Sequence, residues 1–156
     1  MKLAVVGNPG FIDRSYEVPT KTLFARCGNN TGNLVFWYAF NTHIKESTRT
    51  YLGFHFNPDV VNAQDAMVFI LANHLNPNMD LGPIADRLEK VTVPVLSLGL
   101  GLQIPLGIDF PTLPEGSQRF FNLLSEKAEV IGLRGEATQS ALADMGIHNT
   151  EVIGCI

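Results

Sequence analysis

One continuously apolar segment, Ala66 to Ala72, constrains the fold of this chain more than any other feature. It reads AMVFILA, and an asparagine-rich polar segment, residues 73–78, follows it directly. A strand that is apolar along its whole length is covered on both faces, which is typical of the centre of a parallel sheet. The segment therefore predicts a sheet with helices packed against it.

Other apolar segments alternate with helical patterns on either side of this strand. Short strands are predicted at 2–6, 22–26, 93–98, 130–133 and 151–153, and an edge or half-exposed strand at 51–57. Helices are predicted at 34–44, 84–90, 117–127 and 136–145. The first would turn Leu34, Trp37, Tyr38 and Asn41 inward, Ser117 would cap the third, and Gly146 would end the last. We expect turns or loops at 7–10, 11–21 and 104–114. The order predicts an α/β fold, a three-layer Rossmann-like domain with a mostly parallel sheet.

Length and composition narrow the function classes. The 156 residues suit a single domain, and 46% of them are hydrophobic. A net charge of -4 without a basic cluster argues against nucleic-acid binding. No membrane span or signal peptide is expected, so the sequence predicts a cytoplasmic protein. Cys27 and Cys155 lack metal-ligand spacing, so we expect reduced thiols and no metal site.

Four polar loops follow predicted strands, at 28–33, 73–78, 99–103 and 134–136. Ligands of parallel sheets collect at the carboxyl ends of the strands, so we expect these loops to form one cleft. In the first loop, glycine and a helix N-terminus would turn backbone N–H groups toward phosphate, carboxylate or sugar hydroxyls. The alternative is a structural one: glycines supply a turn, and Asn30 or Thr31 caps the helix.

Charged and titratable side chains near these loops are further candidates. Arg134 follows a buried strand and precedes a helix, where it would attract an anion or, alternatively, pair with Glu136. His74 follows the central strand, although a surface role is the alternative. Gly99 and Gly101 form too short a glycine pattern for a dinucleotide site and indicate a turn. The candidate ligand-binding residues are Arg26, Gly28, Asn30, Thr31, Gly32, Asn33, His74, Gly101, Gln103 and Arg134.

Three segments carry a family resemblance, GNNTGNL (28–34), VPVLSLGLGLQ (93–103) and EVIGLRGEATQSALADMGIHNTEVIGC (129–155). In this order they resemble the N-terminal half of the polysaccharide pyruvyltransferase family. The last segment matches four family features in order. They are a strand, Arg-Gly-x-x-Thr at the start of a helix, Gly-Ile, and a strand that ends on Gly-Cys. Arg134, Gly135, Thr138, Gly146 and Cys155 occupy those positions.

The resemblance implies the first half of a GT-B-like fold, with the second half absent from residues 1–156. It also implies transfer of a pyruvyl group from phosphoenolpyruvate to a sugar of a surface polysaccharide, as in exopolysaccharide biosynthesis. Phosphoenolpyruvate would be a donor substrate, no separate cofactor is implied, and the catalytic residue is left open. The alternatives are a non-catalytic carbohydrate- or nucleotide-binding module, or an oligomerising relic that pairs with another copy or with a missing second domain.

Overall fold

The computed structural model describes residues 1–7, 10–45, 47–105, 110 and 112–155. Within them six strands form one sheet in the order β2-β1-β3-β4-β5-β6, and every neighbouring pair is parallel. The strands are β1 (Lys2–Val6), β2 (Thr48–Leu52), β3 (Ala66–Ile70), β4 (Val95–Leu100), β5 (Ala128–Leu133) and β6 (Thr150–Val152). The α/β fold with a parallel sheet is confirmed.

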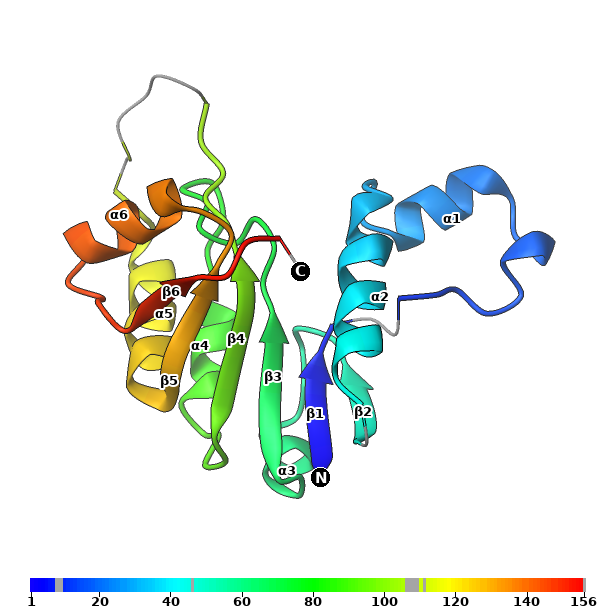
Figure 1. Cartoon of the computed structure of the whole chain (residues 1–156), viewed down its shortest axis with the longest axis horizontal. Helices are drawn as coiled ribbons and strands as arrows, with labels where there is room; N and C mark the ends of the chain where they lie inside the picture. Colours follow the sequence, from blue (N-terminus) through cyan, green and yellow to red (C-terminus); the bar gives the residue numbers. More distant parts are fainter. Residues whose placement is uncertain (8–9, 46, 106–109, 111, 156) are drawn as a thin grey trace.

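Helices cover both faces of the sheet but not equally (Figure 1). They are α1 (Thr20–Arg26), α2 (Gly32–His43), α3 (Pro58–Asn62), α4 (Gly82–Leu88), α5 (Glu115–Lys127) and α6 (Glu136–Asp144), with a short 3-10 turn at Ser15–Glu17. Buried side chains of α3 to α6 share one apolar cluster with β1, β3, β4 and β5. On the opposite face α2 packs Phe36 and Phe40 against β1 and β3. The result is a three-layer, Rossmann-like arrangement.

The segment 66–72 forms β3 and the first residues beyond it, in the middle of the sheet. Met67 and Phe69 point into the larger cluster, whereas Val68 and Ile70 point into the cluster under α2. Because successive side chains of a strand point to opposite faces, the continuous apolar sequence is explained by helices on both sides. The prediction made from this segment is therefore confirmed.

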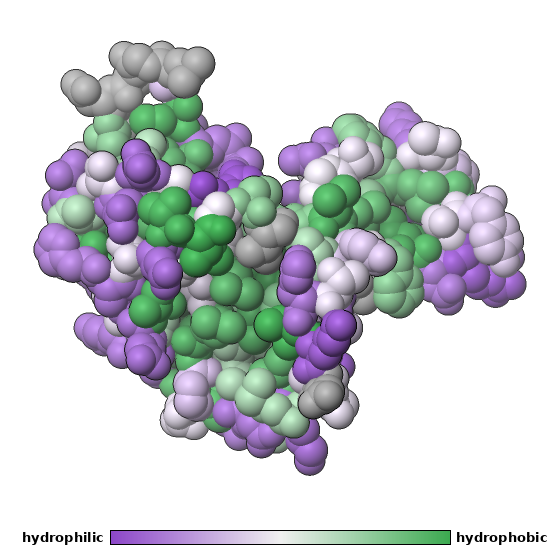
Figure 2. All heavy atoms as spheres, in the orientation of Figure 1, coloured by the Kyte–Doolittle hydropathy of each residue, from purple (hydrophilic) through white to green (hydrophobic). Residues whose placement is uncertain are grey.

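One part of the sheet carries apolar side chains without a covering helix among the described residues. Leu96 of β4 is 41% exposed, Val130 of β5 is 38% exposed, and Ile153, just beyond β6, is 40% exposed. Figure 2 shows apolar residues on this face of the sheet, to one side of α2. We call these three residues the open sheet face.

The segment 22–26, predicted as a strand, is a helix. It lies within α1, which begins directly after Pro19, buries no side chain and projects away from the sheet (Figure 1). Proline favours the start of a helix because its φ is already helical and it has no N–H to satisfy. Five residues of mixed polarity are too few for the apolar pattern to separate a helix from a strand.

Other predictions needed smaller corrections. Only residues 51 and 52 of the strand predicted at 51–57 lie in a strand, because the edge strand β2 begins at Thr48 and ends at Leu52, before Gly53. Helix α2 turns Phe36 and Phe40 inward, whereas Tyr38 is 61% exposed. The segment 104–114 and the turn at 7–10 lie partly outside the described residues.

Ser117 does not cap α5, because the helix already begins at Glu115. The side chain is buried instead, and its Oγ donates to Met79 O (2.6 Å) and accepts from Leu81 N (3.0 Å). A hydroxyl can do both because it carries one donor and two acceptor sites. Ser117 thus joins α5 to the segment that leads into α4.

Candidate functional site

A cavity of about 610 Å³ lies at the carboxyl edge of the sheet, between α1 and α2 on one side and the ends of β3 and β4 on the other. This is the edge at which parallel-sheet proteins bind ligands. Its polar lining residues are Arg26, Gly28, Asn30, Asn33, Asn73, His74 and Gln103. Its apolar lining residues are Ala25, Phe36, Trp37, Phe54, Ile70, Ala72 and Met79.

Six of the ten predicted site residues line this cavity. Arg26, Gly28, Asn30 and Asn33 come from the end of α1, the α1–α2 loop and the start of α2, whereas His74 and Gln103 follow β3 and β4. These residues are distant in sequence. The neighbouring strands β3 and β4 bring His74 and Gln103 together, as the topology predicts, whereas the loop that carries Gly28 and Asn30 follows helix α1 and not a strand.

The other four predicted residues do not line the cavity. Thr31 lies in a separate apolar hollow beside α1, together with Leu23, Phe24 and Cys27. Gly32 is the first residue of α2, and its N–H is already bound by the Asn30 side chain (2.9 Å). Arg134 and Gly101, the remaining pair, lie behind the cavity wall.

Arg134 reaches the cavity through Asn73. Its guanidinium donates to the Asn73 side-chain oxygen, and its backbone N–H donates to Leu100 O (2.9 Å). The alternative of an ion pair with Glu136 is wrong, because the two ion pairs found within the described residues are Arg14–Glu17 and Arg119–Asp86. In the part of the chain that the structure describes, no carboxylate pairs with this half-buried, positively charged guanidinium.

The loops after β3 and β4 are tied together behind the cavity. Gly101 N donates to Ala72 O (2.6 Å), and Gln103 N donates to Leu75 O (3.0 Å). Buried Thr138, in the first turn of α6, accepts from Leu102 N (3.1 Å). The Arg-Gly-x-x-Thr segment therefore places its arginine beside Asn73 and anchors the β4 loop with its threonine.

The backbone amides of residues 28–33 do not face a ligand, contrary to the prediction. The N–H groups of Gly28, Asn29, Asn30 and Asn33 all donate to carbonyl oxygens within residues 24–30. The reason is that a helix, not a strand, leads into this loop, so the loop N–H groups close the end of α1 and the start of α2. The Asn30 and Asn33 side chains present polar groups to the cavity instead.

His74 is the titratable side chain whose pKa the site shifts most. Burial lowers the pKa of His74 to about 4, because the charged ring loses contact with water. Its Nδ1 atom is buried without a hydrogen-bond partner, and its ring lies 4.8 Å from that of Phe54. His74 is therefore a neutral imidazole at pH 7 and carries no imidazolium proton for acid catalysis.

Sequence reasoning missed the aromatic lining of the cavity. Phe36 and Trp37 come from α2, and Phe54 comes from the loop after β2. Asn73 was also missed as a site residue, although it lies just beyond the strongest predicted strand. That position, at the carboxyl end of the central strand, is the signal that identifies it.

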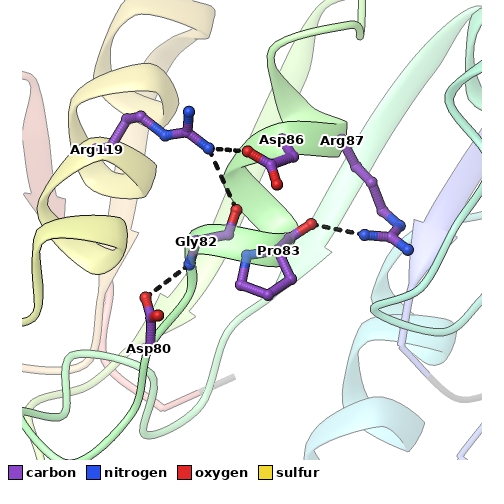
Figure 3. A network of polar contacts seen from close by, with 6 residues as sticks. All are labelled: Asp80, Gly82, Pro83, Asp86, Arg87 and Arg119. Carbon is purple, nitrogen blue, oxygen red and sulfur yellow. Dashed lines mark hydrogen bonds and ion pairs between the residues drawn. The ribbon is translucent and has the colours of Figure 1, made fainter.

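A larger hollow of about 750 Å³ lies between α4 and α5, lined by residues within 80–86 and 115–122. Its Arg119 already pairs with Asp86 and donates to Gly82 O, whereas Asp80 accepts from Gly82 N (2.9 Å) (Figure 3). These side chains are exposed and satisfy one another. We therefore take the cavity at the strand ends as the candidate site.

Metal and membrane features complete the description of the site. Among the described residues, no three His, Cys, Asp or Glu side chains lie close enough together to hold a metal ion. A search of those residues also finds no helix long and apolar enough to cross a membrane. The candidate site is therefore assigned from its amide, aromatic and cationic side chains.

Comparison with known proteins gives one match. The family described as Polysaccharide pyruvyl transferase matches residues 12–156, which include every residue that lines the cavity. Comparisons with curated proteins and with solved structures gave no match. The matched range covers most of the 156 residues and agrees with the three resembling segments. The chain belongs to the polysaccharide pyruvyl transferase family.

Proposed function

We propose that this chain is a pyruvyltransferase-like domain that acts on phosphoenolpyruvate and a sugar of a surface polysaccharide. The observation that supports this is the cavity at the strand ends, where amide side chains and aromatic rings lie beside Arg26 and Arg134. Amides exchange hydrogen bonds with sugar hydroxyls, and a guanidinium binds phosphate or carboxylate through paired N–H groups. The cavity would hold the sugar, and Arg134 would hold the anionic donor at its edge.

Charge supports a place for an anion at this edge. Among the described residues that line the cavity none is acidic, whereas Arg26 lines it and Arg134 contacts its wall. A doubly or triply charged donor would be attracted by the two cations and not repelled. The proton that pyruvyl transfer requires has no evident source here, because His74 is neutral and unable to act as a strong acid at pH 7.

The experiment compares Arg134→Ala with Arg87→Ala. Arg87 has the same charge but lies on α4, where it donates to Pro83 O (2.7 Å) (Figure 3). Calorimetry with phosphoenolpyruvate should show binding to the wild type and to Arg87→Ala. Loss of one charge-assisted contact should weaken binding to Arg134→Ala by roughly tenfold or more. Equal binding by all three proteins would refute the role of Arg134.

A second candidate function is a carbohydrate-binding module without catalysis. It is favoured by the aromatic and amide lining and by the lack of an acidic side chain among the lining residues that the structure describes. Incubation with phosphoenolpyruvate and sugar acceptors separates the two functions. Release of phosphate that depends on the sugar supports transfer, whereas sugar binding without phosphate release supports the module.

A further inference from the structure

His74 lies on the cavity wall with its ring packed against Phe54 and its Nδ1 atom buried. One face of its ring packs against Phe54, at 4.8 Å between ring centroids and 40° between planes. Its Nδ1 atom is sealed from solvent and has no hydrogen-bond partner, although the side chain as a whole is only partly buried and lines the cavity. The nitrogen left to meet a ligand is therefore Nε2.

A neutral imidazole carries one N–H, and its other nitrogen is an acceptor. Nδ1 lacks a partner in either form, which costs about 1–3 kcal/mol whether it is a buried donor or a buried acceptor. The form with the proton on Nε2 is the one that offers its donor to a ligand in the cavity, and we assign the proton to Nε2 on that ground. The charged ring would need N–H groups on both nitrogens, and the burial that lowers the pKa to about 4 opposes that charge.

The groups around His74 favour the same neutral form. Arg26 in the cavity lining and Arg134 behind Asn73 are cations and cannot pair with a charged imidazole, and burial is what lowers the pKa of His74. His55 and Asp80, on the neighbouring loops, are exposed and do not line the cavity. The part of the cavity lining that the structure describes thus contains no carboxylate that would stabilise a charged His74.

The other lining groups match an uncharged, hydroxyl-rich ligand. Asn30 Oδ1 already accepts from Gly32 N, and Asn33 Nδ2 already donates to Cys27 O. The Asn30 amide N–H groups, the Asn33 amide oxygen and the Gln103 amide remain to donate to and accept from a ligand. Phe36 and Trp37 add aromatic surface, which binds the apolar faces of a ring. A cavity of about 610 Å³ is within the range that holds small organic ligands.

We propose that the cavity binds an uncharged sugar ring and that His74 is a specificity-determining residue, donating a hydrogen bond from Nε2 to a sugar oxygen. This inference deepens the proposed function and rests on it, because it assigns the sugar to the cavity and leaves the anionic donor to Arg134. The hydrogen bond needs no change of charge on His74. Sugar binding is therefore independent of pH between about 5 and 8, where an ordinary histidine titrates.

The first experiment is nitrogen NMR of the imidazole side chains of the whole chain, with His74→Gln to assign the His74 signals. We expect Nε2 to carry the proton and the ring to stay neutral down to about pH 5. A proton on Nδ1, or a titration midpoint near 6.5, would overturn the proposal. The measurement is made on the wild-type protein, and His74→Gln serves only to assign the His74 signals.

The second experiment measures binding of methyl glycosides of glucose, galactose and mannose by saturation-transfer NMR and calorimetry. His74→Phe keeps a ring beside Phe54 but loses the donor, so binding should weaken by about tenfold. His74→Gln places an amide N–H near the position of Nε2, so it should bind within about threefold of the wild type. His148→Gln, a change at an exposed histidine on the loop before β6, is the matched control and should bind normally.

The results also separate this inference from the proposed function. Loss of glycoside binding in His74→Phe together with no phosphoenolpyruvate binding by the wild type would keep the sugar site and refute the pyruvyltransferase-like role. The inference would be refuted if His74→Phe and the wild type bound glycosides equally, or if neither bound any glycoside. The proposed function would still stand in that case if phosphoenolpyruvate bound through Arg134. Thermal unfolding of each variant checks that it is folded.

Discussion

Gly101 lies directly against the guanidinium of Arg134. A Cβ at position 101 would stand 2.5 Å from Arg134 Nε and 2.6 Å from its terminal nitrogen, closer than atoms approach without a shift. The atoms in the way are at the end of a flexible side chain, and Gly101 does not have a left-handed φ. An added methyl group would therefore move Arg134 without straining the backbone.

Gly101→Ala should fold normally and bind phosphoenolpyruvate more weakly. Displacing the guanidinium removes its contact with Asn73, and we expect roughly a tenfold loss of affinity by calorimetry. Gly135→Ala is the matched control, because a Cβ there meets no atom within 4 Å and its φ of -175° suits any residue. Equal binding by the two variants would show that the position of Arg134 does not matter to the donor.

Gly99→Ala should destabilise the protein. Gly99 has a φ of +69°, and a Cβ there would overlap the ring of Phe36, through which α2 packs on the sheet. Backbone strain and overpacking together should lower the free energy of unfolding by about 2–4 kcal/mol, measured in denaturant. Gly53→Ala, where no atom lies within 4 Å, should change it by less than about 1 kcal/mol. A similar loss in both variants would contradict this explanation.

Ser117→Ala should loosen the contact between α5 and the segment before α4. It removes the hydroxyl that Met79 O and Leu81 N share, so one buried acceptor and one buried donor lose their partner. We expect a loss of about 1–3 kcal/mol in the free energy of unfolding. Ser140→Ala makes the same chemical change at an exposed position of α6 and should leave stability almost unchanged. Identical denaturation midpoints would disprove the role of Ser117.

Stability should fall as pH falls from 6.5 to about 4, in part because of His74. The unfolded chain takes up a proton at His74 near pH 6.5, whereas the folded chain takes it up near 4, so protons favour unfolding between these values. The contribution is at most about 3 kcal/mol, complete above pH 6.5 and lost by about pH 4. Subtracting the denaturation curves of His74→Gln from those of the wild type isolates it. A difference that does not change with pH would contradict the lowered pKa.

Much of the fold follows from apolar segments of the sequence. The segments 2–6 and 66–72 carry enough consecutive apolar residues to identify β1 and β3, and Gly146, with a φ of +81°, follows the end of α6 as expected. Helix α1 was not predictable from its apolar pattern, because it buries no side chain and therefore needs no apolar face. Pro19 was the available signal for its start.

The candidate site was predictable as a region but not as a set of contacts. The cavity brings together His74 and Gln103, which follow β3 and β4 as the strand-end rule predicts, and Asn30, whose loop follows helix α1. The contact between Arg134 and Asn73 depends on the register of three neighbouring strands, which no local pattern specifies. The aromatic wall depends on how α2 rests on the sheet.

The cavity is built from segments that precede β2 and segments that follow β3 and β4, so it exists only while the chain is folded. A ligand bound there contacts both the first part and later parts of the polypeptide, so it binds only the folded protein. By mass action it adds about 2.7 kcal/mol to the free energy of unfolding when its concentration is a hundred times its dissociation constant. A search for the natural sugar can therefore use the rise in melting temperature as its readout, before any turnover is known.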